Sequence, residues 1–200
     1  MSKRLIVGAP SSNHLEPRIG GAALIGGIVD WPLAADGSPL VLVASIPNRF
    51  ISNAAGLRLA PELHTSVFSY FSAVDYFLDE ITYHGSQEEL ECLLRGGTKV
   101  LQHPPGSNIT QSIGIPPHRL ELGELITEDN DCGSRVGAPP CLLQNETLDL
   151  QEMSFALQLR SSDFPGEFKD IFGLPDALGY LYLREESNAL DNGIFFVQTT

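Results

Sequence analysis

The sequence is poor in basic residues and in long apolar runs, and each shortage excludes a class of protein. Only 12 Lys and Arg stand against 25 Asp and Glu, which gives the 200 residues a net charge of −13. A nucleic-acid-binding protein needs a basic face to meet phosphate, so we expect no direct nucleic-acid partner. No run approaches the roughly 18 consecutive apolar residues of a membrane span, so we expect no membrane association either.

Cysteine is also scarce, and its count bears on the compartment. The three cysteines are Cys92, Cys132 and Cys141. An odd number leaves at least one thiol unpaired, and reduced cysteines in a cytosolic protein are the simplest interpretation. The N-terminal apolar run stops at Gly8, short of the apolar core of a secretory signal peptide. We therefore expect a cytoplasmic protein with reduced cysteines.

Four segments of the first half recur in the second half in the same order. Residues 18–22 match 135–139, residues 39–46 match 154–160, residues 66–71 match 179–183, and residues 79–84 match 193–198. The last three pairs are rich in the apolar, β-branched and aromatic residues of strands. The expected fold class is α+β: mostly antiparallel β, with an internal duplication of a β unit and a few short helices. We expect one domain, residues 1–200, whose pseudo-repeats at about 18–98 and 135–200 are joined by the Pro/Gly-rich residues 99–117.

The residue patterns also predict how individual elements lie. A continuous apolar run at residues 40–44 predicts a strand buried on both faces, whereas alternation places Phe155, Leu157 and Leu159 on one face of a later strand. A capping box of Ser86 and Glu89 predicts the start of a helix that ends at residues 96–97, two glycines. The leucines of residues 117–126 fit a second helix, although they also fit other periods.

Most of the acidic excess falls in the second part of the chain, since residues 121–200 carry fifteen acids against four bases. Acidic runs are usually solvated faces that keep a protein soluble. The functional alternative is a surface that attracts a basic partner by long-range steering. The candidate partner-binding residues are Glu121, Glu124, Glu128, Asp129, Asp131, Glu185, Glu186 and Asp191.

No residue pattern indicates catalysis, and we expect no enzyme, no metal and no cofactor. The five histidines lack metal-ligand spacing, and no CxxC, P-loop, GxGxxG or Gly-x-Ser-x-Gly motif occurs. His84 could pair with Asp79 or Glu80 as an acid or base, but local hydrogen bonding is the favoured interpretation. Cys141 lacks an identifiable base and is interpreted as a structural thiol. The calcium-loop-like residues 129–133 place glycine at the fifth ligand position, which argues against a site.

Several short motifs occur in an order typical of one family. They are Arg-Ile-Gly-Gly at 18–21, Asp-Trp-Pro at 30–32, Asp-Gly-Ser-Pro-Leu at 36–40, Cys-Leu-Leu-Gln at 141–144, Leu-Gln-Leu at 157–159 and Gly-Tyr-Leu-Tyr-Leu at 179–183. Over roughly residues 18–200 the chain resembles the YwqG-like family, a domain first named as one of unknown function. It departs from the family pattern at Ala23, where a proline is usual, and at residues 40–46, which lack the usual glutamine.

The resemblance implies a largely antiparallel α+β fold with a duplicated β unit. It also implies an immunity protein that binds and neutralises a cognate secreted bacterial toxin, a DNase of a type VI secretion system, in the cytoplasm. On this hypothesis the acidic residues mask the toxin's basic active-site or DNA-binding surface. The alternative hypothesis is a small-molecule or peptide-binding domain, or a weak enzyme, that uses a cleft between the two pseudo-repeats.

Overall fold

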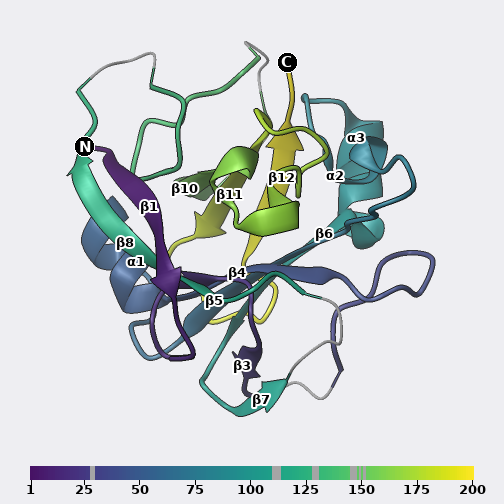
Figure 1. Cartoon of the computed structure of the whole chain (residues 1–200). Coiled ribbons are helices and arrows are strands. Elements are labelled where there is room, and N and C mark those ends of the chain that lie inside the picture. The colour runs from purple at the N-terminus through teal and green to yellow at the C-terminus, as the bar shows by residue number, and fades with distance from the viewer. Residues whose placement is uncertain (28–29, 110–113, 128–130, 145–147, 149, 151) are drawn as a thin grey trace.

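A computed structural model describes residues 1–27, 30–109, 114–127, 131–144, 148, 150 and 152–200 (Figure 1). Ten of its strands form one antiparallel sheet in the order β12-β11-β10-β9-β1-β8-β2-β4-β5-β6, and β3 pairs with β7 in a separate ribbon. The strands are β1 (Lys3–Pro10), β2 (Arg18–Ile19), β3 (Ala23–Ile25), β4 (Val41–Pro47), β5 (His64–Ser69), β6 (Thr98–His103), β7 (Ser107–Ile109), β8 (His118–Leu125), β9 (Arg135–Val136), β10 (Met153–Arg160), β11 (Leu178–Arg184) and β12 (Gly193–Gln198). The expected mostly antiparallel β architecture with few short helices is confirmed.

The helices are short and lie in the connections between strands. They are α1 (Asn48–Ala55), α2 (Leu78–Ile81), α3 (Gln87–Cys92), the π-helical turn η1 (Leu93–Gly97) and the 3₁₀ turns η2 (Ser161–Asp163) and η3 (Gly166–Phe168). In the part of the chain that the structure describes, no helix is long and apolar enough to cross a membrane. The predicted capping box is confirmed, because Ser86 accepts a hydrogen bond from the Glu89 amide and the Glu89 carboxylate accepts one from the Ser86 amide.

The order of strands in the main sheet is symmetric about the β1–β8 pair. Outward from β1 the sheet continues through β9, β10, β11 and β12, and outward from β8 it continues through β2, β4, β5 and β6. Each half therefore places its first strand in the middle of the sheet, where β1 pairs with β9 and β8 pairs with β2. Strand β1 of the first part thus pairs with β9 of the second part, and β8 pairs with β2, which joins the two parts of the chain into one sheet.

The sheet curls until its two end strands, β6 and β12, approach each other and nearly close a barrel. The Gln102 amide donates to the Leu190 carbonyl at 2.8 Å, and the Thr98 hydroxyl donates to the Phe195 carbonyl at 2.6 Å. An antiparallel bridge joins Leu101 to Asp191. Contacts across this seam join the first and second parts of the chain a second time.

The strand predictions hold for β4, β5, β10, β11 and β12, but the predicted face of β10 is wrong. The register of β10 against β11 shifts between Phe155 and Leu157, which is a β-bulge. Phe155 therefore packs with Tyr182 in one buried cluster, whereas Leu157 packs in the other. Both faces of β10 are covered, and even Gln158 is fully buried.

Three other sequence-based predictions are corrected by the structure. Residues 117–126, predicted as a helix, form strand β8, because polar and apolar residues alternate there and Leu120 alone is buried among its leucines. Residues 79–84, predicted as a strand, begin in helix α2, whose first turn carries two acids where the helix dipole favours them. Residues 99–117 are not merely a connection, since they contain most of β6 and all of β7.

Two arginines hold equivalent places in the two halves. Arg18 in β2 is fully buried, and its guanidinium donates to the backbone carbonyl of Ala22, four residues on. Arg135 in β9 is 3% exposed and donates to the carbonyl of Pro139, again four residues on, at 3.4 Å. Burial lowers the pKa of Arg18 to about 10 and also lowers the pKa of Arg135. Residues 18–22 and 135–139 thus each place a buried arginine that donates to a carbonyl four residues on.

Candidate interaction surface

The structure separates the predicted partner-binding acids into two groups. Glu121, Glu124 and Asp131 lie on or just after β8, near the start of β1. Glu185, Glu186 and Asp191 lie on the connection from β11 to β12 at the seam. Glu128 and Asp129 lie outside the described residues.

Five of these predicted residues form ion pairs within the chain. The pairs are Arg119–Glu121 at 2.6 Å, Arg4–Asp131, Arg58–Glu185 at 3.3 Å, Arg58–Glu186 at 2.5 Å and Lys99–Asp191 at 2.8 Å. Such exposed pairs add little stability, about 0–1 kcal/mol each, but each base cancels local negative charge. The two groups therefore project a weaker negative field than their sequence density indicates.

Glu185 has a structural role beyond its ion pair. Its carboxylate accepts hydrogen bonds from the Arg58 backbone N–H at 2.9 Å and from the Ser154 hydroxyl at 2.8 Å. These donors hold the pKa of Glu185 below its ordinary value. These hydrogen bonds hold the β11–β12 connection against Arg58 and Ser154, and they leave the carboxylate less free to bind a partner.

A hollow that none of the predicted residues line lies elsewhere, between the loop that follows β5 and the turn around η3. It has a volume of about 610 Å³. We call it the acidic groove, and its lining residues are Phe71, Ser72, Ala73, Val74, Asp75, Tyr76, Phe77, Leu78, Glu167, Phe168, Asp170 and Gly173. Both parts of the chain line it: one wall is formed by residues between β5 and α2, and the other by residues between β10 and β11.

Aromatic packing builds the floor of the acidic groove. The ring of Phe71 lies 5.6 Å from that of Phe77 and 5.8 Å from that of Phe168, between centroids. Phe77 and Phe168 are buried, and Phe71 is half-buried. These contacts attach the loop after β5 to η3 and hold the two walls in a fixed relation.

Local hydrogen bonds turn the side chains of the loop outward. The Ser72 hydroxyl accepts from the backbone N–H of Val74 at 3.3 Å and of Asp75 at 2.9 Å, which forms a tight turn. Val74 is consequently 90% exposed and Tyr76 is 73% exposed. The Tyr76 hydroxyl donates to Asp79 at 3.0 Å, and this bond raises the pKa of Tyr76. An exposed aromatic ring held in place is a common anchor of protein interfaces.

The charge of the acidic groove is of one sign. Its lining contains Asp75, Glu167 and Asp170 and no Lys, Arg or His. Among the described residues none of these three carboxylates forms an ion pair, and all three are exposed. Lys169 is exposed and precedes Asp170 in the sequence, but it does not line the groove. An apolar floor with an acidic rim suits a basic partner.

Sequence reasoning did not choose these residues as a site. Asp75 lies in the first part of the chain, where the overall acidic excess is small, and Glu167 and Asp170 form only a minor cluster. A usable signal was present in residues 72–77, where a strand is followed by Val, Asp, Tyr and Phe without a base. That pattern predicts an exposed loop, but it does not predict that η3 packs opposite the loop.

The candidate catalytic groups are held in local structural contacts. His84 Nδ1 lies 3.2 Å from Glu89, within the capping box of α3, rather than beside Asp79 or Glu80. Cys92 contacts Glu80 at 3.4 Å, and burial followed by that hydrogen bond raises the pKa of its thiol, which disfavours the nucleophilic thiolate. No group of three His, Cys, Asp or Glu residues positioned for a metal ion occurs in the described ranges.

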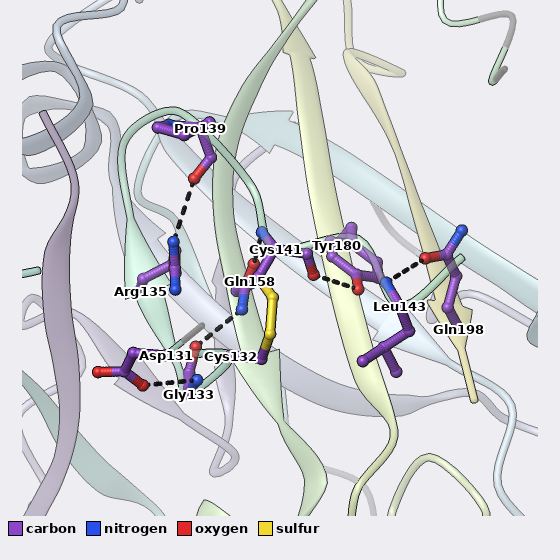
Figure 2. Close-up of a disulfide and its surroundings, with 10 residues drawn as sticks. All are labelled: Asp131, Cys132, Gly133, Arg135, Pro139, Cys141, Leu143, Gln158, Tyr180 and Gln198. Atoms are coloured by element: carbon purple, nitrogen blue, oxygen red, sulfur yellow. Dashed lines mark hydrogen bonds between the residues drawn. A yellow bond between two sulfur atoms is a disulfide. The ribbon is translucent and has the colours of Figure 1, made fainter. Parts of the chain in front are cut away.

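The prediction of three reduced cysteines is wrong in this structure, which pairs Cys132 with Cys141 (Figure 2). Their Cα atoms lie 5.3 Å apart, within the range for a disulfide, because the chain turns back on itself after β9. Cys92 is the free cysteine. Residues 132–141 thus form a closed loop beside β10.

Buried side chains from three strands hold the disulfide loop in place (Figure 2). Gln158 of β10 accepts from the Cys141 amide at 2.8 Å and donates to the Gly133 carbonyl at 2.8 Å. The Tyr180 hydroxyl donates to the Cys141 carbonyl at 2.8 Å, and Gln198 accepts from the Leu143 amide at 3.1 Å. Cys141 is therefore a structural residue, and sequence reasoning missed its partner.

In comparisons with known proteins, no family model matches the chain, and no curated protein matches it either. The similarity to the YwqG-like family accordingly stays a prediction that rests on the motifs described above.

Proposed function

We propose that this protein is an immunity protein that binds a cognate secreted bacterial toxin in the cytoplasm and neutralises it. The toxin is a nuclease, best matched by a DNase of a type VI secretion system. The acidic groove covers the basic surface with which the toxin meets nucleic acid. This proposal keeps the function class implied by the YwqG-like motifs and moves the principal contact from the predicted acidic clusters to the acidic groove.

The observation that carries the proposal is a groove whose apolar floor is lined by acids and by no base. Asp75, Glu167 and Asp170 have no base among the residues that line the groove, while Tyr76 and Val74 project from its wall. Charges of one sign accelerate the encounter with an oppositely charged partner, and buried aromatic anchors slow dissociation. A nuclease cleft is basic because its substrate is a polyanion, so it offers the complementary charge.

We further infer that the two halves of the sheet descend from a duplicated β unit. The symmetric strand order and the equivalent buried arginines, Arg18 and Arg135, support this inference. The fourth matching segment of the second unit, β12, then corresponds to β6 rather than to residues 79–84. Because β1 and β8 are exchanged between the halves, neither half could fold alone.

The test is rescue and binding with the toxin domain encoded by the adjacent reading frame. Co-expression of the chain should restore growth of cells that express the toxin. In the variant Asp75→Asn/Glu167→Gln/Asp170→Asn, we expect the association rate at low salt to fall at least tenfold and its salt dependence to weaken.

The matched control removes the same number of charges from acids that are ion-paired within the chain, as Glu121→Gln/Glu186→Gln/Asp191→Asn. We expect this variant to associate at nearly the rate of the unmodified protein. If the control is the slower of the two, the originally predicted acidic clusters form the interface instead. Failure of the unmodified chain to rescue cells would overturn the immunity function itself.

A further inference from the structure

A second hollow lies at the seam where β6 meets β12, on neither wall of the acidic groove. It has a volume of about 470 Å³, within the usual range of small-molecule pockets. A neighbouring hollow of about 350 Å³ shares Leu94, Thr98, Lys99 and Asp191 with it. The shared residues place the two hollows side by side, and we call the pair the seam groove.

Apolar side chains from both parts of the chain form the seam groove. Val100 of β6 and Ile194 of β12 are buried at its floor, and Met153 of β10 stands beside them. Leu94 is 63% exposed and Leu190 is 45% exposed, both on its walls. Large apolar side chains left this open along a groove favour an apolar occupant.

The charges of the seam groove differ from those of the acidic groove. Lys99 and Arg184 line its larger hollow with only one acid, Asp191, which already pairs with Lys99 at 2.8 Å. Arg184 is exposed and forms no ion pair among the described residues. Within a protein of net charge −13, this hollow therefore offers an uncompensated cation.

Backbone contacts fix the point at which the Arg184 side chain leaves the sheet. Arg184 is the last residue of β11 and pairs in register with Met153 of β10. Its carbonyl accepts a hydrogen bond from the Asn192 side chain at 3.1 Å, which ties it to the start of β12. The Arg184 side chain therefore starts at the β11 end of the larger hollow, whose lining also includes Val100, Ile194 and Leu94.

We propose that the seam groove binds a linear apolar carboxylate, such as a medium-chain fatty acid. The carboxylate lies on the guanidinium of Arg184, which can donate two parallel hydrogen bonds to it. The hydrocarbon chain lies over Val100 and Ile194 and extends toward Leu94. This site is separate from the acidic groove and does not depend on toxin binding.

The single tryptophan supplies a local probe of occupancy. Trp31 lines the smaller hollow of the seam groove, and its Nε1 donates to the Leu40 carbonyl at 2.7 Å. Its ring packs edge-on against the buried Phe68 at 5.2 Å between centroids. A ligand that extends past Leu94 should change the fluorescence of Trp31.

The test titrates decanoate, below its micelle concentration, into the full chain, with decanol as the uncharged analogue. Calorimetry should detect saturable binding of decanoate that is at least tenfold tighter than that of decanol, together with a change in Trp31 fluorescence. Arg184→Gln should remove this preference and leave decanol binding unchanged. Arg160→Gln is the matched control, because Arg160 is an exposed arginine at the opposite end of the β10–β11 pair.

Leu94→Asp, which places a charge on the wall, should weaken both ligands. Equal affinity for decanoate and decanol in the unmodified protein, or an unchanged preference in Arg184→Gln, would overturn the proposed carboxylate site. Absence of saturable binding by either ligand would overturn the groove as a binding site. Circular dichroism of each variant distinguishes these results from unfolding.

Discussion

Reduction of the Cys132–Cys141 disulfide should destabilise the protein without unfolding it. The two cysteines are 9 residues apart, and closing a loop of that length restricts the unfolded chain by about 2–3 kcal/mol. In the folded state the loop keeps its hydrogen bonds to Gln158 and Tyr180 after the sulfur–sulfur bond is broken, and Leu143, just beyond the loop, keeps its bond to Gln198. We therefore expect the free energy of unfolding to fall by that amount while the circular dichroism spectrum stays unchanged.

The same loop allows the hydrogen bonds to be weighed against the disulfide. Gln158→Ala leaves the Cys141 amide and the Gly133 carbonyl without their partner, which costs about 1–3 kcal/mol if the loop stays in place. In the reduced Gln158→Ala protein the ends of the loop on either side of β9 can move away from β10, so the orphaned Cys141 amide and Gly133 carbonyl meet water. Reduction and Gln158→Ala together should therefore cost less than the sum of their separate effects, by about 0.5 kcal/mol or more.

The measurement is urea unfolding of the oxidised and reduced proteins, followed by Trp31 fluorescence. All variants carry Cys92→Ser, which removes the free thiol and prevents exchange of disulfides. Mass spectrometry after alkylation reports whether Cys132 is oxidised in protein purified from the cytoplasm. An unchanged unfolding midpoint on reduction would refute the stabilising role of the disulfide, and strictly additive effects would refute its coupling to Gln158.

Two further predictions concern stability. Burial, together with the charges of His103 and Arg18, lowers the pKa of His64 to about 4, against 6.5 in the unfolded chain. Below pH 6.5 the unfolded chain therefore binds a proton that the folded protein does not, and the free energy of unfolding should fall by about 2 kcal/mol from pH 6.5 to 4. His64→Leu should flatten this pH dependence in urea titrations, and an unchanged slope would contradict the prediction. A Cβ on buried Gly97 would clash with the Glu80 carbonyl oxygen, so Gly97→Ala should lower the unfolding free energy by about 3 kcal/mol. Gly114→Ala, whose Cβ would contact none of the described residues, should be neutral by the same measurement.

The sequence predicted the elements whose signals are local. Apolar and aromatic runs identified β4, β5, β10, β11 and β12, and the capping box identified α3. Strand β8 was mistaken for a helix because leucines at 120, 122 and 125 satisfy both periods. Only pairing with β1 on one side and β2 on the other decides between them, and pairing is a property of the whole fold.

The bulge in β10 and the disulfide escaped prediction for a related reason. Alternation in residues 155–159 assumes a regular strand, and a single extra residue reverses the face of everything before it. An odd number of cysteines likewise shows that at least one is unpaired, but it does not show which two form a disulfide. Both features depend on where β9 and β11 place the neighbouring backbone.

The acidic groove escaped prediction because charge density along a chain differs from charge available to a partner. Acids at 121, 131, 185, 186 and 191 are dense in sequence, but folding brings Arg4, Arg58, Lys99 and Arg119 beside them. Asp75 and Glu167 are far apart in sequence and meet no base, so their charges add at one groove. A basic partner responds to the summed field, so acids that keep no ion pair in the folded chain are a better guide to a contact surface than the density of acids along the sequence.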